Sequence, residues 1–375
     1  MSWAFSTQQK VILCCSSTRH RRFIDNLMQV MALPEGGRIR LRYGNKHCDP
    51  LVQRMGTEEF RSRDTLVIIA HVRFVDRDGR FLPLRSGKLL EIKTEGSMTY
   101  LDVELHDFVQ EIQGQSFSDE IGQLATHPLP NNPEGAPAPE GTFCQLLSAP
   151  PIMTTASGSI LWEKVAEDFL EAIKGSNAEF PFLFHLDILE RTSSGTRKVP
   201  FSRGLLVAPS ISRIEIQMRT LVDKSLFNRF IDRPVGTIEI GVEHPELSLI
   251  SRNTLQIDTT RNLMTSGISA KLGLRPAYGT ITVTSRRGSD LKLETGVDLE
   301  DRRLPDEIVI EIPVSVGGRL RRWSAAAALA FAAAAHKFDL RALDSEPYGV
   351  VAQAAFVFVG VLAALWLGFK PQSGS

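Results

Sequence analysis

The sequence predicts a mostly β protein of the α+β class, with a small α/β or barrel-like N-terminal domain, a β-sandwich-like second domain and a C-terminal transmembrane helix or helical hairpin. Three observations lead to this prediction. In residues 1–115, one segment whose apolar residues have helical spacing lies among several strand-like runs. In residues 151–318, apolar residues alternate along several segments, and an uncharged run lies near the carboxyl end. The composition, 43% hydrophobic and 23% charged, excludes a disordered chain, and four cysteines are too few for a disulfide framework.

The N-terminal domain is expected to combine one helix with several strands. A strand is predicted at residues 10–15 and a helix at residues 18–32, where apolar residues recur with helical spacing. Strand-like runs follow at residues 38–43, 65–75, 80–84, 88–94 and 100–105. Asp78 and Gly79 lie between two such runs and are typical of a tight hairpin. One helix among turn-linked strands favours an α+β domain or small barrel over a doubly wound parallel sheet.

Residues 116–150 are predicted to be a proline-rich linker. The run HPLPNNPEGAPAPEG, from His127 to Gly141, contains five prolines and one large apolar residue, Leu129. Proline donates no backbone hydrogen bond and fixes its own φ angle, so this run is unsuited to a helix or an interior strand. We therefore expect it to separate the two folded regions.

The second region, residues 151–318, is predicted to form a β-sandwich. It begins with an amphipathic helix at residues 160–173 and continues as strands whose apolar residues alternate, which is typical of strands with one buried face. The alternation is seen in Phe180, Phe182, Phe184, Leu186 and Ile188, in Ile214 and Ile216, in Ile238 and Ile240, in Ile281 and Val283, and in Ile308, Ile310 and Ile312. Turns every ten or so residues favour a sandwich, interrupted by a helix at residues 221–231.

Residues 349–369 form an uncharged run of the length that a bilayer core requires, and we expect them to form a C-terminal membrane anchor in contact with lipid. A buried core helix is the alternative. Residues 323–335 are rich in alanine and too short to span a membrane alone, so they are predicted to be either the second arm of a helical hairpin or a surface helix. Small residues recur every four positions and predict helix packing within a homo-oligomer: Gly360, Ala364 and Gly368.

The orientation of this anchor follows from its flanking charges. Arg319, Arg321 and Arg322 precede the first apolar segment, and such clusters remain on the cytoplasmic side. The sequence therefore predicts that residues 1–322 are cytoplasmic.

No local sequence motif identifies a reaction, a cofactor or a metal. The Walker pattern, the dinucleotide glycine fingerprint, the serine-hydrolase elbow, HExxH and paired CxxC motifs are all absent from the sequence. His47, Cys48 and Asp49 are adjacent and point in different directions, so a turn before Pro50 is favoured over a metal site. His185 and Asp187 would share one strand face, either as an acid/base pair or as a surface hydrogen bond.

Charge is distributed unevenly along the N-terminal half. Residues 1–90 contain 16 Lys and Arg against 8 Asp and Glu, whereas residues 91–150 contain 1 Lys against 10 Asp and Glu. One interpretation is that neighbouring strands of one domain pair these charges. The other interpretation is a basic face for an anion, since Arg outnumbers Lys and its planar guanidinium suits phosphate.

The run CCSSTRHRR, residues 14–22, is the sharpest candidate site. A strand delivers Ser16, Ser17 and Thr18 to the start of a helix, where hydroxyls and unpaired backbone N–H groups can hold an anion. Ordinary N-capping explains the hydroxyls equally well. It does not explain basic residues in the first turn, where the helix dipole disfavours cations. The predicted ligand-binding residues are Ser16, Ser17, Thr18, Arg19, His20, Arg21, Arg22, Arg40 and Arg42.

These features predict a membrane-anchored cytoplasmic sensor or effector without enzymatic activity. Its N-terminal domain would bind an anionic small molecule, a nucleotide or an acidic partner, and the sandwich would relay binding to the C-terminal helices. A membrane-tethered scaffold that recruits proteins along exposed strand edges is the alternative. A third hypothesis is a hydrolase or nuclease that uses His185 and Asp187, or the cluster at His47.

Overall fold

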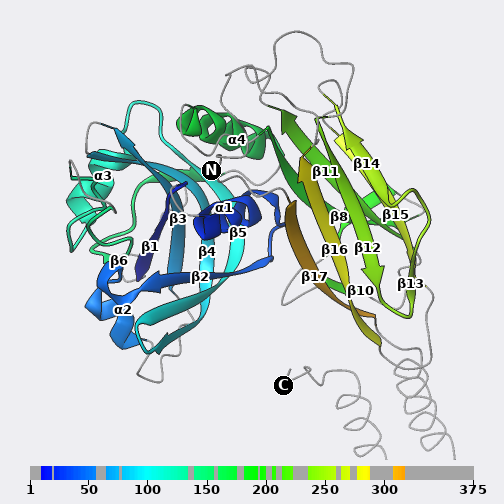
Figure 1. Ribbon diagram of the computed structural model, residues 1–375, viewed down its shortest axis with the longest axis horizontal. Coiled ribbons are helices and arrows are strands. Elements are labelled where there is room, and N and C mark those ends of the chain that lie inside the picture. The colour runs from blue at the N-terminus through cyan, green and yellow to red at the C-terminus, as the bar shows by residue number, and fades with distance from the viewer. Residues whose placement is uncertain are drawn as a thin grey trace, which may run out of the picture.

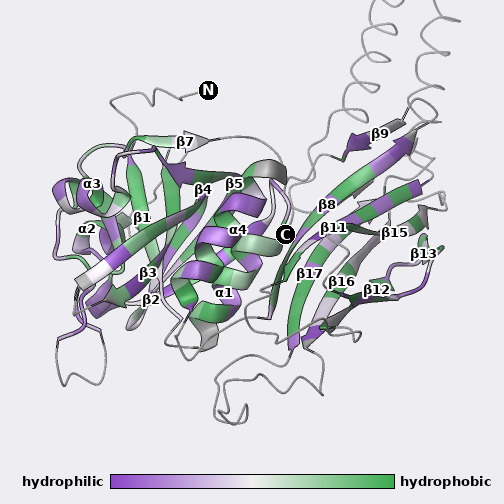
Figure 2. Ribbon diagram, turned by 90° about the horizontal axis from the view of Figure 1, so that it is seen from above, coloured by the Kyte–Doolittle hydropathy of each residue, from purple (hydrophilic) through white to green (hydrophobic). Residues whose placement is uncertain are grey.

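The computed structural model describes two β-rich parts with two helices between them (Figures 1 and 2). The described residues are 10–18, 21–55, 65–75, 78–133, 139–155, 159–174, 181–192, 195–199, 205–207, 213–222, 235–258, 263–270, 277–287 and 307–316. The first part is a half-barrel sheet, and the second consists of two five-stranded sheets.

The half-barrel sheet has the strand order β2-β5-β4-β3-β1-β6, and β7 pairs with β5. Only β1 and β3 run parallel among these described pairs. The strands are β1 (Val11–Ser16), β2 (Arg38–Gly44), β3 (Leu66–Val75), β4 (Asp78–Glu95), β5 (Met98–Glu111), β6 (Cys144–Leu147) and β7 (Met153–Thr155). The connection from β1 to β2, which lies at the far edge of the sheet, runs through the helix α1 (Arg21–Ala32).

Irregular strand pairing accounts for the curvature of the sheet. The register shifts once between β3 and β4 and twice between β4 and β5. Such bulges bend a strand and increase its twist. Gly87 sits at one of these shifts, where an added Cβ would lie 2.6 Å from Val103 Cγ1. The two long strands β4 and β5 can therefore approach closely while they bend around the core.

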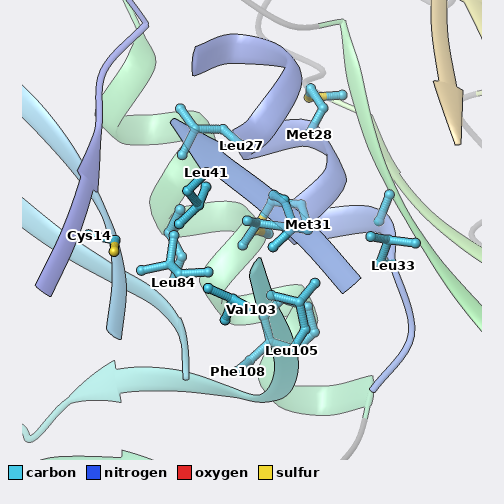
Figure 3. Close-up of a cluster of buried hydrophobic side chains, with 14 of the residues drawn as sticks. Cys14, Leu27, Met28, Met31, Leu33, Leu41, Leu84, Val103, Leu105 and Phe108 are labelled. Carbon is cyan, nitrogen blue, oxygen red and sulfur yellow. The ribbon is translucent and has the colours of Figure 1, made fainter. Parts of the chain in front are cut away.

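Helix α1 (Arg21–Ala32) packs its apolar side onto the buried face of this sheet. Leu27 and Met31 meet Leu41 of β2, with Leu84 and Val103 beneath them (Figure 3). The strand β2 alternates between exposed and buried residues, so its arginines face away from the side chains that meet α1. The other described helices are η1 (Asn45–His47), α2 (Pro50–Met55), α3 (Phe117–Leu124) and α4 (Ser159–Ile173).

The second part has the sheet orders β10-β17-β16-β12-β14 and β13-β15-β11-β8-β9, arranged as two layers (Figure 1). Its strands are β8 (Phe182–Thr192), β9 (Gly195–Lys198), β10 (Leu205–Val207), β11 (Arg213–Val222), β12 (Gly236–Glu243), β13 (Leu247–Leu249), β14 (Thr254–Ile257), β15 (Leu263–Ala270), β16 (Ala277–Arg287) and β17 (Glu307–Val316). Alternate residues are buried, among them Ile238, Ile240, Ile310 and Ile312, because period two places them on the inner faces. Residues 223–234, most of the predicted interrupting helix, lie outside the described residues.

Residues 116–150, for which the sequence predicted a linker, supply α3 and β6 to the half-barrel part. Strand β6 pairs with β1, and Asn131 and Glu140 bridge one another across the proline-rich run. The helix α4, predicted to open the second region, contacts β3, β4 and β5 as well as β11. The change from half-barrel to sandwich therefore follows α4.

The membrane part of the predicted fold class is corrected. Among the described residues, no helix combines the length and the apolar character needed to cross a bilayer. The longest described helix, α4, has 15 residues and carries charges such as Glu163, Lys164 and Glu167. The segments 323–335 and 349–369, with Gly360, Ala364 and Gly368, lie outside the described residues, as do Arg319, Arg321 and Arg322.

The corrected class is a mostly β chain with a half-barrel sheet. The prediction of a transmembrane helix, a C-terminal anchor and a membrane location rested on hydropathy in one window. Apolar composition favours burial in general and does not by itself distinguish lipid from a protein core.

Candidate functional site

The carboxyl end of β1 is the candidate site, and it is built on a fully buried strand. All six residues of β1 are buried, because the strand lies between β3 and β6 and its residues Val11 to Cys15 are apolar. Two polar residues, Ser16 and Ser17, follow them and are also buried, at 1% and 2% exposure. The chain then passes Thr18 and enters α1 at Arg21.

Two side chains from other strands hold the last two carbonyl groups of β1. The hydroxyl of Tyr43, on β2, donates to the carbonyl oxygen of Cys15 at 3.1 Å. The Nδ1 atom of His71, on β3, lies 3.2 Å from the carbonyl oxygen of Ser16. A carbonyl oxygen only accepts, so Nδ1 carries the proton and Nε2 does not. The strand end is therefore fixed from both sides before the turn begins.

His71 is neutral in the folded protein. Burial lowers its pKa from 6.5 to about 4, the hydrogen bond to Ser16 opposes this, and Arg73 adds to the lowering. Its ring meets Phe169 of α4 edge to face, with centroids 5.2 Å apart. The imidazole therefore positions the backbone and contributes no positive charge to the site.

Ser17 carries the one feature of this turn that ordinary folding does not explain. Within the described part of the chain, its Oγ atom is buried without a hydrogen-bond partner. Leaving a buried hydroxyl unsatisfied costs about 1 to 3 kcal/mol. N-capping, the alternative role for these hydroxyls, would have given this oxygen a backbone N–H as donor. Among the described residues, no backbone N–H group donates to Ser17 Oγ as N-capping would require.

The first turn of α1 is electrostatically unusual. Arg21 and Arg22 begin the helix, and its first turn as described contains no acidic residue. The positive end of the helix dipole lies there, together with backbone N–H groups that lack intrahelical partners. Arg19 and His20 lie outside the described residues, as do the side chains of Arg21 and Arg22. The described elements of the site are thus Ser16, Ser17, Thr18 and the backbone that starts α1.

The structure does not bring Arg40 and Arg42 to this site. Both are exposed on β2, on the side opposite to Tyr43, whose hydroxyl contacts β1. Arg40 forms two hydrogen bonds of 2.6 Å with Asp102, its cross-strand neighbour on β5, and this partner raises the pKa of Arg40. In this pair, a positive charge from residues 1–90 and a negative charge from residues 91–150 neutralise each other across neighbouring strands.

The cluster His47, Cys48 and Asp49 forms a turn that is stabilised by Asp49. This carboxylate is fully buried and accepts from the backbone N–H groups of Leu51 at 2.7 Å and Leu146 at 3.1 Å. Thr126 Oγ1 lies 3.3 Å from it and donates to the Leu146 carbonyl oxygen at 2.9 Å, and His127 Nε2 lies 3.2 Å from Asp49. His47 turns instead to the carbonyl oxygen of Gly141 at 3.2 Å. The three adjacent side chains therefore serve different local contacts.

His185 and Asp187 share a strand face but do not form a hydrogen bond. Their nearest atoms, His185 Nε2 and Asp187 Oδ1, are 3.9 Å apart, and both side chains are buried. Lys198 and Arg219 lie 3.5 and 3.7 Å from the Asp187 carboxylate. His185 directs Nδ1 to the carbonyl oxygen of Met31 in the half-barrel part. This arrangement joins two parts of the fold and leaves no open face for a substrate on the His185 ring.

No metal cluster is formed within the described ranges, where no group of three or more His, Cys, Asp or Glu side chains could hold an ion. Cys14, Cys15, Cys48 and Cys144 are buried free thiols. Burial is the main cause of the raised pKa values of Cys15 and Cys144. These thiols pack as small apolar side chains.

The sequence did not reveal Tyr43 or His71 as contributors to the site at the end of β1. His71 is the one buried polar residue in the run LVIIAHVRFV, whose other polar residue, Arg73, is exposed. Its partner at Ser16 lies 55 residues away. A polar residue isolated in a buried strand indicates a specific partner without identifying it.

Comparison with known proteins adds no family to this description. No protein-family model matches the chain, and no curated protein matches it.

Proposed function

We propose that this protein is a non-enzymatic sensor that binds a phosphate-like anion at the junction of β1 and α1. The observation that carries the proposal is the buried Ser17 hydroxyl, which lacks a partner at the start of a helix. An anion of a small molecule or nucleotide would accept from this hydroxyl and from the first backbone N–H groups of α1. We also propose that residues 1–322 are cytoplasmic.

Electrostatics supports an anion in particular. A cation in the first turn of a helix costs about 0.3 to 1 kcal/mol, and α1 begins with two arginines. A bound dianion would reverse the sign of that interaction for each of them. Their guanidinium groups would suit phosphate oxygens, which accept paired hydrogen bonds.

The arrangement at Ser17 favours binding over catalysis. An activated serine nucleophile needs a base within hydrogen-bond reach. Ser17 Oγ has no such contact with any described residue, and the protonated nitrogen of His71 is committed to the Ser16 carbonyl. A site of this kind holds a ligand without transferring a proton.

The experiment is isothermal titration of the full chain with inorganic phosphate, pyrophosphate and adenosine monophosphate. We expect saturable binding of at least one probe that Ser17→Ala weakens and that combined reversal of Arg19, Arg21 and Arg22 to Glu abolishes. Arg40→Ala and Arg42→Ala are the matched controls, because these arginines lie on the opposite face of β2. Absence of binding for all three probes, or unchanged binding after the triple reversal, would overturn the proposal.

Recruitment of a protein along a strand edge is the second candidate. Strand β9 lies at the edge of its sheet, and all four of its residues are exposed. The register with β8 and the bond from Val199 N to Ile188 O place the N–H group of Thr196 on the outer side. Thr196→Pro would therefore remove an outward donor and keep the β8 pairing. If purified partners bind this edge, that variant should lose them, whereas Thr237→Pro in the interior strand β12 should unfold the sheet.

A further inference from the structure

The C-terminal end of α1 lies where the half-barrel part meets the sandwich. Strand β8 of the sandwich contacts α1, and α4 contacts both β5 and β11. In Figure 2, α1 and α4 lie between the two β-rich parts. The helix that begins at the candidate anion site therefore ends at the contact between those parts.

Three side chains from three different elements donate to carbonyl groups in the last turn of α1 and at Leu33, which follows it. Arg85, on β4, donates through Nη1 to the carbonyl oxygens of Val30 at 2.9 Å and Leu33 at 2.6 Å. Trp162, on α4, donates through Nε1 to the carbonyl oxygen of Met31 at 3.1 Å. His185, on β8, directs Nδ1 at the same Met31 oxygen at 3.2 Å. These carbonyls lack intrahelical donors, so side chains complete the helix end.

The three donating residues and Phe108 form one contiguous buried cluster, here called the α1 cap cluster: Arg85, Phe108, Trp162 and His185. The His185 ring stacks on Trp162 with centroids 5.8 Å apart and meets Phe108 edge to face at 5.3 Å. The guanidinium carbon of Arg85 lies 4.5 Å from the centroid of Phe108. All four residues are at most 7% exposed. Shifting one ring therefore disturbs the packing of the others.

The charges of the α1 cap cluster match its position. A cation at the carboxyl end of a helix is favourable, and Arg85 supplies one. Burial lowers its pKa to about 9, so it remains protonated at neutral pH. His185 is neutral because burial, and then the charge of Arg85, lower its pKa to about 3. The Met31 oxygen thus receives two neutral donors, one from each side of the contact.

We propose that the α1 cap cluster is a latch that couples the anion site to the sandwich. Ligand binding at the first turn shifts α1 as a rigid body. The shift is transmitted to β8 through the contact between His185 and the Met31 carbonyl oxygen. The coupling rests on the proposed anion binding. The attachment of β8 to α1 through His185, here called the fastening, does not. His185 and Trp162 act on the ligand site only through the helix.

The fastening is tested by differential scanning calorimetry of the full chain. We expect one cooperative transition for the wild type and two separated transitions for His185→Phe, which keeps a stacked ring and removes the donor. Trp162→Phe is a second variant of the same design, should His185→Phe not fold. His106→Phe is the matched control, since this histidine is exposed on β5. A single transition in both cluster variants, indistinguishable from wild type, would overturn the latch.

The coupling is tested by hydrogen–deuterium exchange with inorganic phosphate. In the wild type, phosphate should change the exchange of β8 peptides, residues 182–192, and His185→Phe should abolish that change. The phosphate Kd should shift by about fivefold or more in the same variant, the lower range of allosteric couplings. Unchanged phosphate effects on β8 in His185→Phe would overturn the coupling. If the wild type binds no phosphate, the proposed function fails, and the calorimetry still decides the fastening.

Discussion

Trp162 and His185 lie stacked, with ring centroids 5.8 Å apart, and each directs a ring nitrogen at the carbonyl oxygen of Met31. The two donors follow Met31 by 131 and 154 residues in the chain. One backbone oxygen at the end of α1 thereby orients both the helix α4 and the strand β8. The position of α1 is set jointly by the half-barrel part and the sandwich.

Arg85 should be essential for stability even though its described hydrogen bonds go to backbone carbonyl groups. Arg85→Gln leaves the carbonyls of Val30, Leu33 and His106 without their common donor and should lower the free energy of unfolding by about 3 kcal/mol or more. Urea unfolding followed by circular dichroism measures this loss. Arg80→Gln, on an exposed position of the same strand, should change it by about 0.5 kcal/mol or less. Similar losses in both variants would contradict the capping role.

His71 should make the protein less stable in mild acid. Its pKa is about 4 in the folded protein and 6.5 when unperturbed, so the unfolded chain binds the extra proton between these values. Stability therefore falls as the pH decreases below about 6.5, by about 2 kcal/mol at pH 5 for this residue. His185 acts in the same direction, because its pKa is also lowered.

The variant His71→Asn isolates this contribution. Asparagine can keep a donor to the Ser16 carbonyl and does not titrate. The loss of stability between pH 7 and pH 5, measured by urea unfolding, should be smaller in this variant by about 2 kcal/mol. Equal losses in both proteins would show that His71 is not held neutral.

Asp49 should contribute far more to stability than the half-buried carboxylate of Asp102. Asp49→Asn turns an amide N–H₂ group toward donors such as Leu146 N and should cost about 3 kcal/mol of unfolding free energy. Asp102→Asn weakens a largely solvated ion pair with Arg40 and should cost about 1 kcal/mol or less. Chemical denaturation of the two variants under the same conditions provides the comparison. A larger loss of unfolding free energy for Asp102→Asn than for Asp49→Asn would show that burial does not determine how much these carboxylates stabilise the protein.

The four thiols should be unreactive in the native protein. Cys14, Cys15, Cys48 and Cys144 are at most 4% exposed, and a raised pKa disfavours the reactive thiolate at Cys15 and Cys144. Labelling by a disulfide reagent such as DTNB should be slower than in urea by about 100-fold or more, because it requires structural opening. Rapid labelling of any one thiol without denaturant would contradict the packing of that residue.

Local patterns were sufficient for several elements of the fold. The apolar run before Ser16 predicted β1, helical spacing from Phe23 to Met31 predicted α1, and period two predicted β8, β16 and β17. The same reasoning placed a candidate site at Ser17, where strand meets helix. The prolines of residues 127–141 led to the prediction of a linker at residues 116–150, and local composition did not reveal that β6 in this range pairs with β1.

The amino-acid sequence alone determined several of the strands and helices, among them β1 and α1, and that polar residues stand at the end of β1, because side-chain periodicity and turn chemistry are local properties. Only the tertiary structure decided that Arg40 is paired with Asp102, that Ser17 is buried without a described partner, and that His185 binds Met31. Partners separated by tens of residues are selected by how the sheet curls and how α1 packs against it. Those choices depend on the shape of the whole core.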